Sequence, residues 1–264
     1  MDSTSTRPRI LTGTISRRVL MIGGTAFVVG GFASADALAR QGTPVASPAT
    51  ASDAEQLLTD AATAMTELDS FAFSLVTVEG ETTIMEGLTL EEISGVVRRP
   101  TDFATTVTVD LPFVSLDLHA VGINNELWIE LPDIGEGGGG WTSLGSSDGL
   151  LSLLNPDVVI LQAVPYVDDP EIVDTGEIDG VDVTWVSGTV AFRAIALRVT
   201  DDGTDLGDQL AEDPVELMIA IDDDKLIREI EMRGPLLASE DENVVRQLTF
   251  SEFNEPVEIE EPQV

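Results

Sequence analysis

Residues 102–111 read DFATTVTVDL, a stretch in which apolar and polar side chains alternate. Phe103, Val107 and Val109 fall on one face, whereas Asp102 and Asp110 fall on the other. A period of two residues is the pattern of a β-strand with one buried and one solvated face. This stretch therefore predicts a strand that packs its apolar face against another layer.

The same period recurs along most of the chain. Strands are expected at residues 71–75, 116–120, 127–131, 176–178, 181–185, 215–221, 226–232, 244–250 and 257–259. The turns between them carry residues that tolerate a positive φ angle, such as Asn124-Asn125 and Asp179-Gly180. Successive hairpins predict an antiparallel sheet, so the expected fold class is α+β.

Two stretches have the composition of helices. Ser52 and Glu55 have the spacing of a capping box, and the apolar residues that follow predict an amphipathic helix over about residues 53–68. Residues 150–164 are apolar nearly all round, and Asn155 and Pro156 suit the start of a helix there. Such a helix must be buried on more than one side or must face an apolar hollow.

Composition limits the possible partners. Of 264 residues, 48 are acidic and 13 are Lys or Arg, which gives a formal net charge of −35. Nucleic acid is not expected to bind such a surface. Because 43% of residues are hydrophobic, the chain has enough apolar material to fold around a sizeable core.

Few residues are available for catalysis. The sequence has no Cys and one His, His119, which alternates with Leu118 and is expected on the wetter face of a strand. The two Asp clusters, residues 201–205 and 222–224, lack the spacing of an EF-hand and are interpreted as solvated turns, with weak Ca²⁺ binding as the alternative. We therefore expect no catalytic residues, no metal site and no cofactor. A hydrolase using His119 remains an alternative.

The first 39 residues have the composition of an export signal. Four arginines precede an uncharged run of about 15 residues, 19–33, and Ala37 and Ala39 suit a signal peptidase, so cleavage is expected after Ala39. The segment Ser16 to Met21 resembles the twin-arginine export motif. Residues 40–52 then form a flexible linker. Retention of the run as an anchor is the alternative, although about 20 apolar residues are needed to span a bilayer.

The order of the elements resembles a known protein family. The segments that carry the resemblance are residues 68–71, 95–100, 141–142, the leucine-rich stretch after Gly149, 176–180, 221–222 and 250–257. They resemble the LppX/LprAFG family of envelope lipoproteins, which includes LprG and shares a fold with the carriers LolA and LolB. The resemblance extends from about Asp53 to Pro262, so residues 53–264 are expected to form one carrier domain.

The resemblance implies a strongly curved antiparallel half-barrel with helices packed on its concave face. Between the two layers it implies an apolar cavity for the acyl chains of envelope lipids. The candidate lining residues are Phe71, Phe73, Leu75, Phe103, Val107 and Val109 from the sheet, and Leu150, Leu151, Leu154, Val158 and Leu161 from the helix. Family members carry a lipidated Cys, and since this sequence has none, a form without that anchor is expected.

The sequence therefore favours an exported, non-enzymatic and monomeric carrier of lipids or other long apolar molecules, with transient membrane contact. The main alternative is an extracytoplasmic surface interaction or structural module in which the same residues pack together as a solid core. The presence and lining of an interior void distinguish the two hypotheses.

Overall fold

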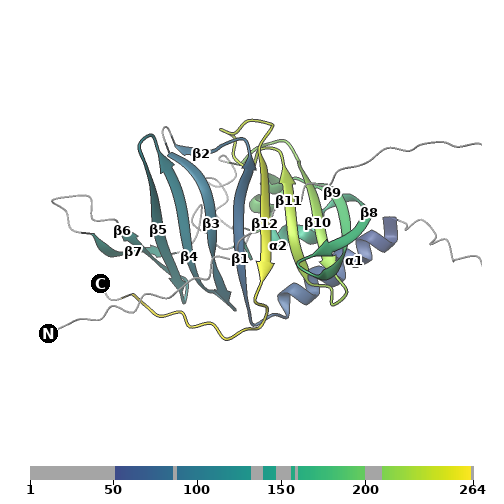
Figure 1. Ribbon diagram of the computed structural model, residues 1–264, viewed down its shortest axis with the longest axis horizontal. Helices are drawn as coiled ribbons and strands as arrows, with labels where there is room; N and C mark the ends of the chain where they lie inside the picture. Colours follow the sequence, from purple (N-terminus) through teal and green to yellow (C-terminus); the bar gives the residue numbers. More distant parts are fainter. Residues whose placement is uncertain are drawn as a thin grey trace, which may run out of the picture. The chain divides into compact units, whose positions relative to one another are not determined.

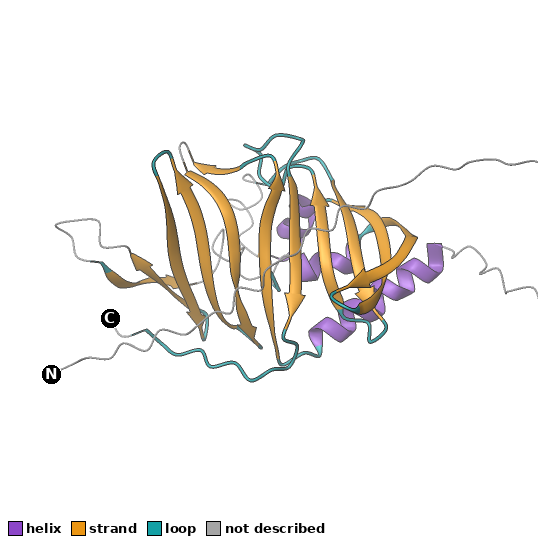
Figure 2. Cartoon of the chain, viewed as in Figure 1, coloured by secondary structure: helices purple, strands orange, loops and turns teal. Residues whose placement is uncertain are grey.

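One antiparallel sheet makes up most of the structure, a computed structural model that describes residues 51–85, 88–131, 139–146, 156–157, 160–199 and 210–262 (Figures 1 and 2). Its twelve strands are β1 (Ser70–Glu79), β2 (Thr82–Met85), β3 (Leu88–Arg98), β4 (Asp102–Leu111), β5 (Val114–Ile123), β6 (Glu126–Leu131), β7 (Gly140–Ser146), β8 (Asp168–Ile178), β9 (Val181–Val190), β10 (Val215–Asp222), β11 (Ile227–Arg233) and β12 (Val245–Ser251). The prediction of an antiparallel sheet is thereby confirmed.

The sheet is open, with the first and last strands of the chain paired at its centre. The strand order is β7-β6-β5-β4-β3-β1-β12-β11-β10-β9-β8, and β2 pairs with β3 beside this path. Residues Phe73 of β1 and Phe250 of β12 lie opposite each other. The ring of Phe71 also meets the ring of Phe250 edge to face, with 5.7 Å between their centroids. Two segments that are far apart in the sequence thus form the middle of the core.

Strand β4 has the alternating burial that its sequence predicts. Phe103, Thr105, Val107 and Val109 are buried, and the residues between them are partly exposed. The turns predicted before β6 and before β9 also form. Asn124 and Asn125 have φ angles of 51° and 68°, and Asp179 has a φ of 50°. These are the left-handed conformations that tight hairpin turns require.

Short helices accompany the sheet: α1 (Ala51–Thr66), α2 (Ile160–Ala163), the 3₁₀ helix η2 (Val164–Tyr166) and α3 (Phe192–Val199). One side of α1 is buried in the same hydrophobic core as the sheet, through Ala54, Leu58, Ala61 and Met65. This helix lies against β8 and η2, and Figure 2 shows the helices gathered beside the β8–β12 part of the sheet. Within the described residues, no helix is long and apolar enough to cross a membrane.

The first helix differs from the sequence-based prediction at both of its ends. The helix expected over residues 53–68 spans Ala51–Thr66, so Ser52 lies inside its first turn and is not the residue that precedes it. Leu68 follows the helix but is buried.

The strand expected at residues 257–259 does not form, and these residues follow β12 without pairing to the sheet. Instead, the guanidinium group of Arg98 donates hydrogen bonds to the carbonyl oxygens of Val257 and Ile259, at 3.5 and 3.4 Å.

Candidate functional site

An apolar pocket lies where β1, β2 and β3 meet α3 and the connection between β11 and β12. Its volume is about 90 Å³. Most of the side chains around it are apolar; the lining residues are Leu75, Thr82, Leu90, Ile93, Pro156, Phe192, Leu210, Leu236, Leu237, Glu240 and Arg246. An apolar cavity of about 150 Å³ is enough to bind benzene. The pocket as it stands therefore has room for a few methylene groups of a guest.

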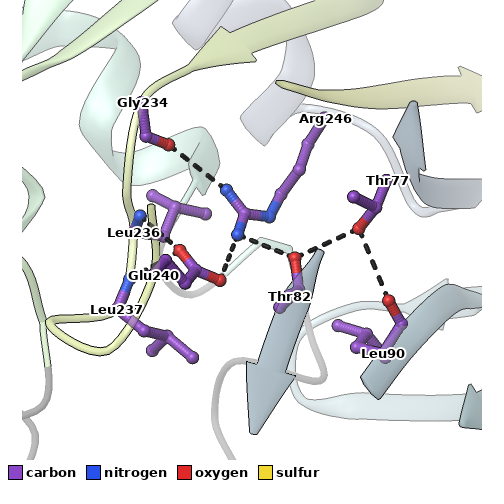
Figure 3. Close-up of polar contacts among 8 residues, drawn as sticks. All are labelled: Thr77, Thr82, Leu90, Gly234, Leu236, Leu237, Glu240 and Arg246. Atoms are coloured by element: carbon purple, nitrogen blue, oxygen red, sulfur yellow. Dashed lines mark hydrogen bonds and ion pairs between the residues drawn. The ribbon is translucent and has the colours of Figure 1, made fainter. Parts of the chain in front are cut away.

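Three polar residues on the pocket wall, Thr82, Glu240 and Arg246, form one cluster (Figure 3). Arg246 of β12 forms an ion pair with Glu240, and its side chain is only 2% exposed, whereas that of Glu240 is fully buried. The same guanidinium group donates to the hydroxyl oxygen of Thr82 at 2.8 Å and to the carbonyl oxygen of Gly234 at 3.4 Å. A charged group is thus held at the wall of an apolar space by surrounding acceptors.

Glu240 also fixes the connection that closes one side of the pocket. Its second carboxylate oxygen accepts hydrogen bonds from the backbone N–H groups of Leu236 and Leu237, at 2.8 and 2.9 Å. Both of these leucines line the pocket. The backbone N–H of Ala211 donates in turn to the carbonyl oxygen of Leu236 at 2.9 Å. The buried ion pair therefore positions two apolar lining residues.

The charges of this cluster offset one another. Burial lowers the pKa of the Arg246 guanidinium group from its usual value, and the carboxylate of Glu240 opposes that shift. Arginine nevertheless stays protonated in proteins because its pKa is so high. The wall consequently presents a neutral ion pair, not a net charge, to whatever enters the pocket.

A second ion pair lies near the pocket residue Pro156. Arg99 donates to a carboxylate oxygen of Asp157 at 2.8 Å and to the carbonyl oxygen of Met65, at the end of α1, at 2.8 Å. Burial raises the pKa of Asp157, and the positive charge of Arg99 partly offsets this rise. This pair connects α1, the segment at Pro156 and the end of β3.

The sheet residues predicted to line a cavity lie mainly in the core. Phe71, Phe73, Phe103, Val107 and Val109 are buried in the hydrophobic core cluster, and Leu75 packs against that cluster and lines the pocket. Of the predicted helix residues, Leu161 is buried in α2. Leu150, Leu151, Leu154 and Val158 lie outside the described residues. The ligand-binding role of the predicted set stays a prediction.

Several pocket residues were missed by sequence reasoning. Phe192 lies in α3, a helix of eight residues that is too short to show a clear period. Leu236, Leu237 and Glu240 lie in a connection with no period at all. Arg246 did carry a signal, because it is a cation that alternates with the apolar residues Val244, Leu248 and Phe250 on one face of the predicted strand.

His119 and Asp222, which were considered for catalysis and for metal binding, each have hydrogen-bond partners within the fold. His119 is exposed on β5, as expected, with its Nδ1 atom 3.1 Å from the hydroxyl oxygen of Thr106. The interpretation of residues 222–224 as a solvated turn is wrong for Asp222, which is buried, whereas Asp223 and Asp224 are exposed. Asp222 accepts hydrogen bonds from the backbone N–H of Leu226 and from the Nε atom of Arg228, at 2.8 and 2.7 Å. Residues 201–205 lie outside the described part. Within that part, no three His, Asp or Glu residues are grouped so that they could hold a metal ion.

Sequence comparison agrees with this architecture. Residues 53–259 match the profile of the LppX_LprAFG lipoprotein family. The chain belongs to this family. No curated protein sequence matches the chain. The sequence of this LppX_LprAFG family member contains no Cys.

Two solved structures share this fold, and a third match is weaker. LprF from Mycobacterium bovis matches with a TM-score of 0.56 and 18% identity, over 82% of this chain and 99% of LprF. The lipoprotein LppX from Mycobacterium tuberculosis matches with a TM-score of 0.52 and 18% identity, over 80% of this chain and all of LppX. A LolA superfamily protein from Nitrosomonas europaea also matches, with a TM-score of 0.28 and 13% identity, over 76% of this chain and 92% of that protein.

Proposed function

We propose that this LppX_LprAFG family member is an exported, non-enzymatic carrier that holds the acyl chains of a lipid or glycolipid. The observation that carries the proposal is the apolar pocket between the β1–β3 strands and α3. An acyl chain gains about 0.8 kcal/mol for each CH₂ group that leaves water, so an apolar interior of this kind supplies the affinity that a lipid carrier needs.

The carrier domain in this proposal is residues 53–264, and the helices pack within the concave side of a half-barrel. The pocket of about 90 Å³ accommodates only part of an acyl chain, so cargo of full length requires the pocket to widen. We place this widening at the pocket wall formed by Leu236 and Leu237. One carboxylate, that of Glu240, holds both residues, so the loss of its two hydrogen bonds frees both of them. The arginine-rich N-terminal segment supports export across the membrane in this proposal.

One observation favours a second candidate function. Five of the six sheet residues predicted to line the cavity are buried in the hydrophobic core cluster. A solid core would suit an extracytoplasmic interaction module that binds partners on its surface and carries no lipid. The two functions differ in what co-purifies with the protein.

Lipid extraction and native mass spectrometry of the purified protein test the proposal. A carrier is expected to release lipid on extraction and to show a bound mass that disappears on delipidation. Leu236→Trp is expected to reduce the bound lipid at least tenfold, because the indole fills a pocket of this size. Leu144→Trp is the matched control, since Leu144 is 44% exposed on β7 and does not line the pocket.

The proposal fails if the protein contains no extractable lipid and takes up none when it is incubated with phospholipid vesicles. It also fails if Leu236→Trp and Leu144→Trp bind as much lipid as the unmodified protein. In either case the interaction module becomes the better description.

A further inference from the structure

The turn between β4 and β5 exposes a group of apolar side chains. Phe113 is 100% exposed, Val114 is 51% exposed and Leu111 is 36% exposed. With Pro112 they form four consecutive apolar residues, 111–114, which we call the apolar tip. Single exposed apolar residues are common on protein surfaces, but a phenylalanine with no packing partner beside other exposed apolar residues marks an interaction site.

The hairpin does not need Phe113 for its own structure. Leu111 and Val114 pair across the turn, and the hydroxyl of Ser115 donates a hydrogen bond to the carboxylate of Asp110. The strands below continue the pairing, from Asp110 opposite Ser115 to Phe103 opposite Gly122. The ring of Phe113 therefore contributes nothing to the core, and its role lies outside the folded chain.

The apolar tip lies at the end of the sheet where the pocket is found. Leu90, a pocket residue of β3, is paired with Val109 of β4, two residues before Leu111. Thr82, another pocket residue, is paired with Leu90. Figure 1 shows β2, the β4–β5 turn and the β11–β12 connection at the same, upper end of the sheet. A surface in contact with the tip would face the pocket end of the molecule.

The negative charges around the apolar tip limit which partners can bind there. Exposed acidic residues lie on the same hairpin and at the same end of β1, namely Asp117, Glu79 and Glu81, and the whole chain has a formal net charge of −35. Nucleic acids, acidic proteins and anionic lipid surfaces are repelled by this charge. An uncharged lipid surface accepts an aromatic ring at its interface without that penalty.

We infer that the apolar tip, residues 111–114, docks the protein on an uncharged or zwitterionic lipid surface by inserting Phe113. This inference rests on the proposed carrier function, because docking there brings the pocket end to the membrane that supplies or receives the cargo. Only a few side chains insert, so binding is weak and reversible, which suits a carrier that must leave again.

Co-sedimentation with phosphatidylcholine vesicles tests the inference. The purified protein is expected to partition onto these vesicles, and Phe113→Asp is expected to reduce the partition coefficient at least tenfold with no change in melting temperature. Val173→Asp is the matched control, because Val173 is 48% exposed on the edge strand β8, and this variant is expected to bind normally. Vesicles containing phosphatidylglycerol are expected to bind the protein less well.

A second variant reports on insertion itself. Phe113→Trp is expected to retain vesicle binding, and brominated phosphatidylcholine is expected to quench its added fluorescence. The inference is overturned if Phe113→Asp binds as well as the unmodified protein, or if neither binds. It is also overturned if the tip instead joins two copies of the chain, which would appear as a dimer that Phe113→Asp dissociates.

The docking and carrier hypotheses fail in different ways. Phe113→Asp is expected to retain its co-purified lipid while losing vesicle binding, whereas Leu236→Trp is expected to lose lipid while still binding vesicles. Absence of lipid from the purified protein and from protein incubated with vesicles would refute the carrier function, whatever happens at Phe113.

Discussion

At the scale of single residues, the pocket depends on a buried ion pair. The side chains of Arg246 and Glu240 are both almost fully inaccessible to solvent. Between them they bind Thr82 and the backbone of Gly234, Leu236 and Leu237. Taking two charges out of water is costly, so such a pair adds little net stability compared with apolar residues. Its contribution here is to hold Leu236 and Leu237 in one position against the pocket.

Removal of one partner alone is expected to be severe. Arg246→Met leaves the carboxylate of Glu240 buried without its counter-ion, so we expect the free energy of unfolding to fall by about 3–5 kcal/mol, measured by urea denaturation. Arg233→Met is the control, because Arg233 forms an ion pair with Glu231 while half of the Arg233 side chain is exposed. This variant is expected to lower the free energy of unfolding by only about 0–1 kcal/mol. Equal losses in the two variants would contradict this account of the pocket wall.

At the scale of elements, local patterns in the sequence were sufficient for hairpins but not for distant pairings. The β8–β9 hairpin was predictable because Asp179-Gly180 marks its turn and alternation marks its strands. Strand β3 was not recognised, because an irregularity in its pairing with β4 between Leu90 and Glu92 breaks the alternation. No local signal indicates that β1 pairs with β12, since the two strands are separated by most of the domain.

The same limit applied to the candidate site. Leu75 was predicted because it belongs to a regular strand, and it does line the pocket. Leu210, Leu236 and Leu237 were not, because a segment without periodicity acquires its place only through tertiary contacts such as the bridge between Leu210 and Leu237. The sequence therefore indicated an apolar interior, whereas the residues that border the pocket depended on how the connections fold over the sheet.

Close packing between β4 and β5 depends on one glycine. Gly122 lies directly opposite Phe103, and a Cβ atom added at Gly122 would lie 2.2 Å from the ring. We therefore expect Gly122→Ala to lower the free energy of unfolding by about 1–3 kcal/mol, measured by urea denaturation.

The control for this prediction is Gly176→Ala in the edge strand β8. There the nearest atom, Nε1 of Trp185, would lie at an ordinary 3.4 Å from the new Cβ atom. The free energy of unfolding of this variant is expected to stay unchanged or to rise by up to about 1 kcal/mol, because Ala lowers the conformational entropy of the unfolded chain. A stable Gly122→Ala protein would mean that Phe103 has room to move within the core.

At the scale of the whole molecule, the excess of acidic residues opposes folding and also protects the open sheet. The edge strand β8 carries five exposed acidic residues, which are Asp168, Asp169, Glu171, Asp174 and Glu177. Charges on an edge strand prevent it from pairing with another sheet. The cost is mutual repulsion within a chain whose formal net charge is −35.

Salt is therefore expected to stabilise this protein at neutral pH. An increase from 0.01 to 0.15 M NaCl shortens the screening length from about 30 to about 8 Å, which weakens repulsion between carboxylates on neighbouring strands. We expect the free energy of unfolding to rise by an amount on the order of 1 kcal/mol, which corresponds to about 2–4 °C in melting temperature. Differential scanning calorimetry of the unmodified protein at pH 7 measures this shift directly.

The same experiment at pH 4.5 provides the control for repulsion. The isoelectric point calculated from the sequence is about 4.1, so the net charge at pH 4.5 is much smaller than at pH 7. The salt-dependent gain is expected to shrink accordingly, because there is less repulsion left to screen. A gain of equal size at both pH values would show that salt acts through apolar burial, and the acidic surface would then have no measurable cost to the fold.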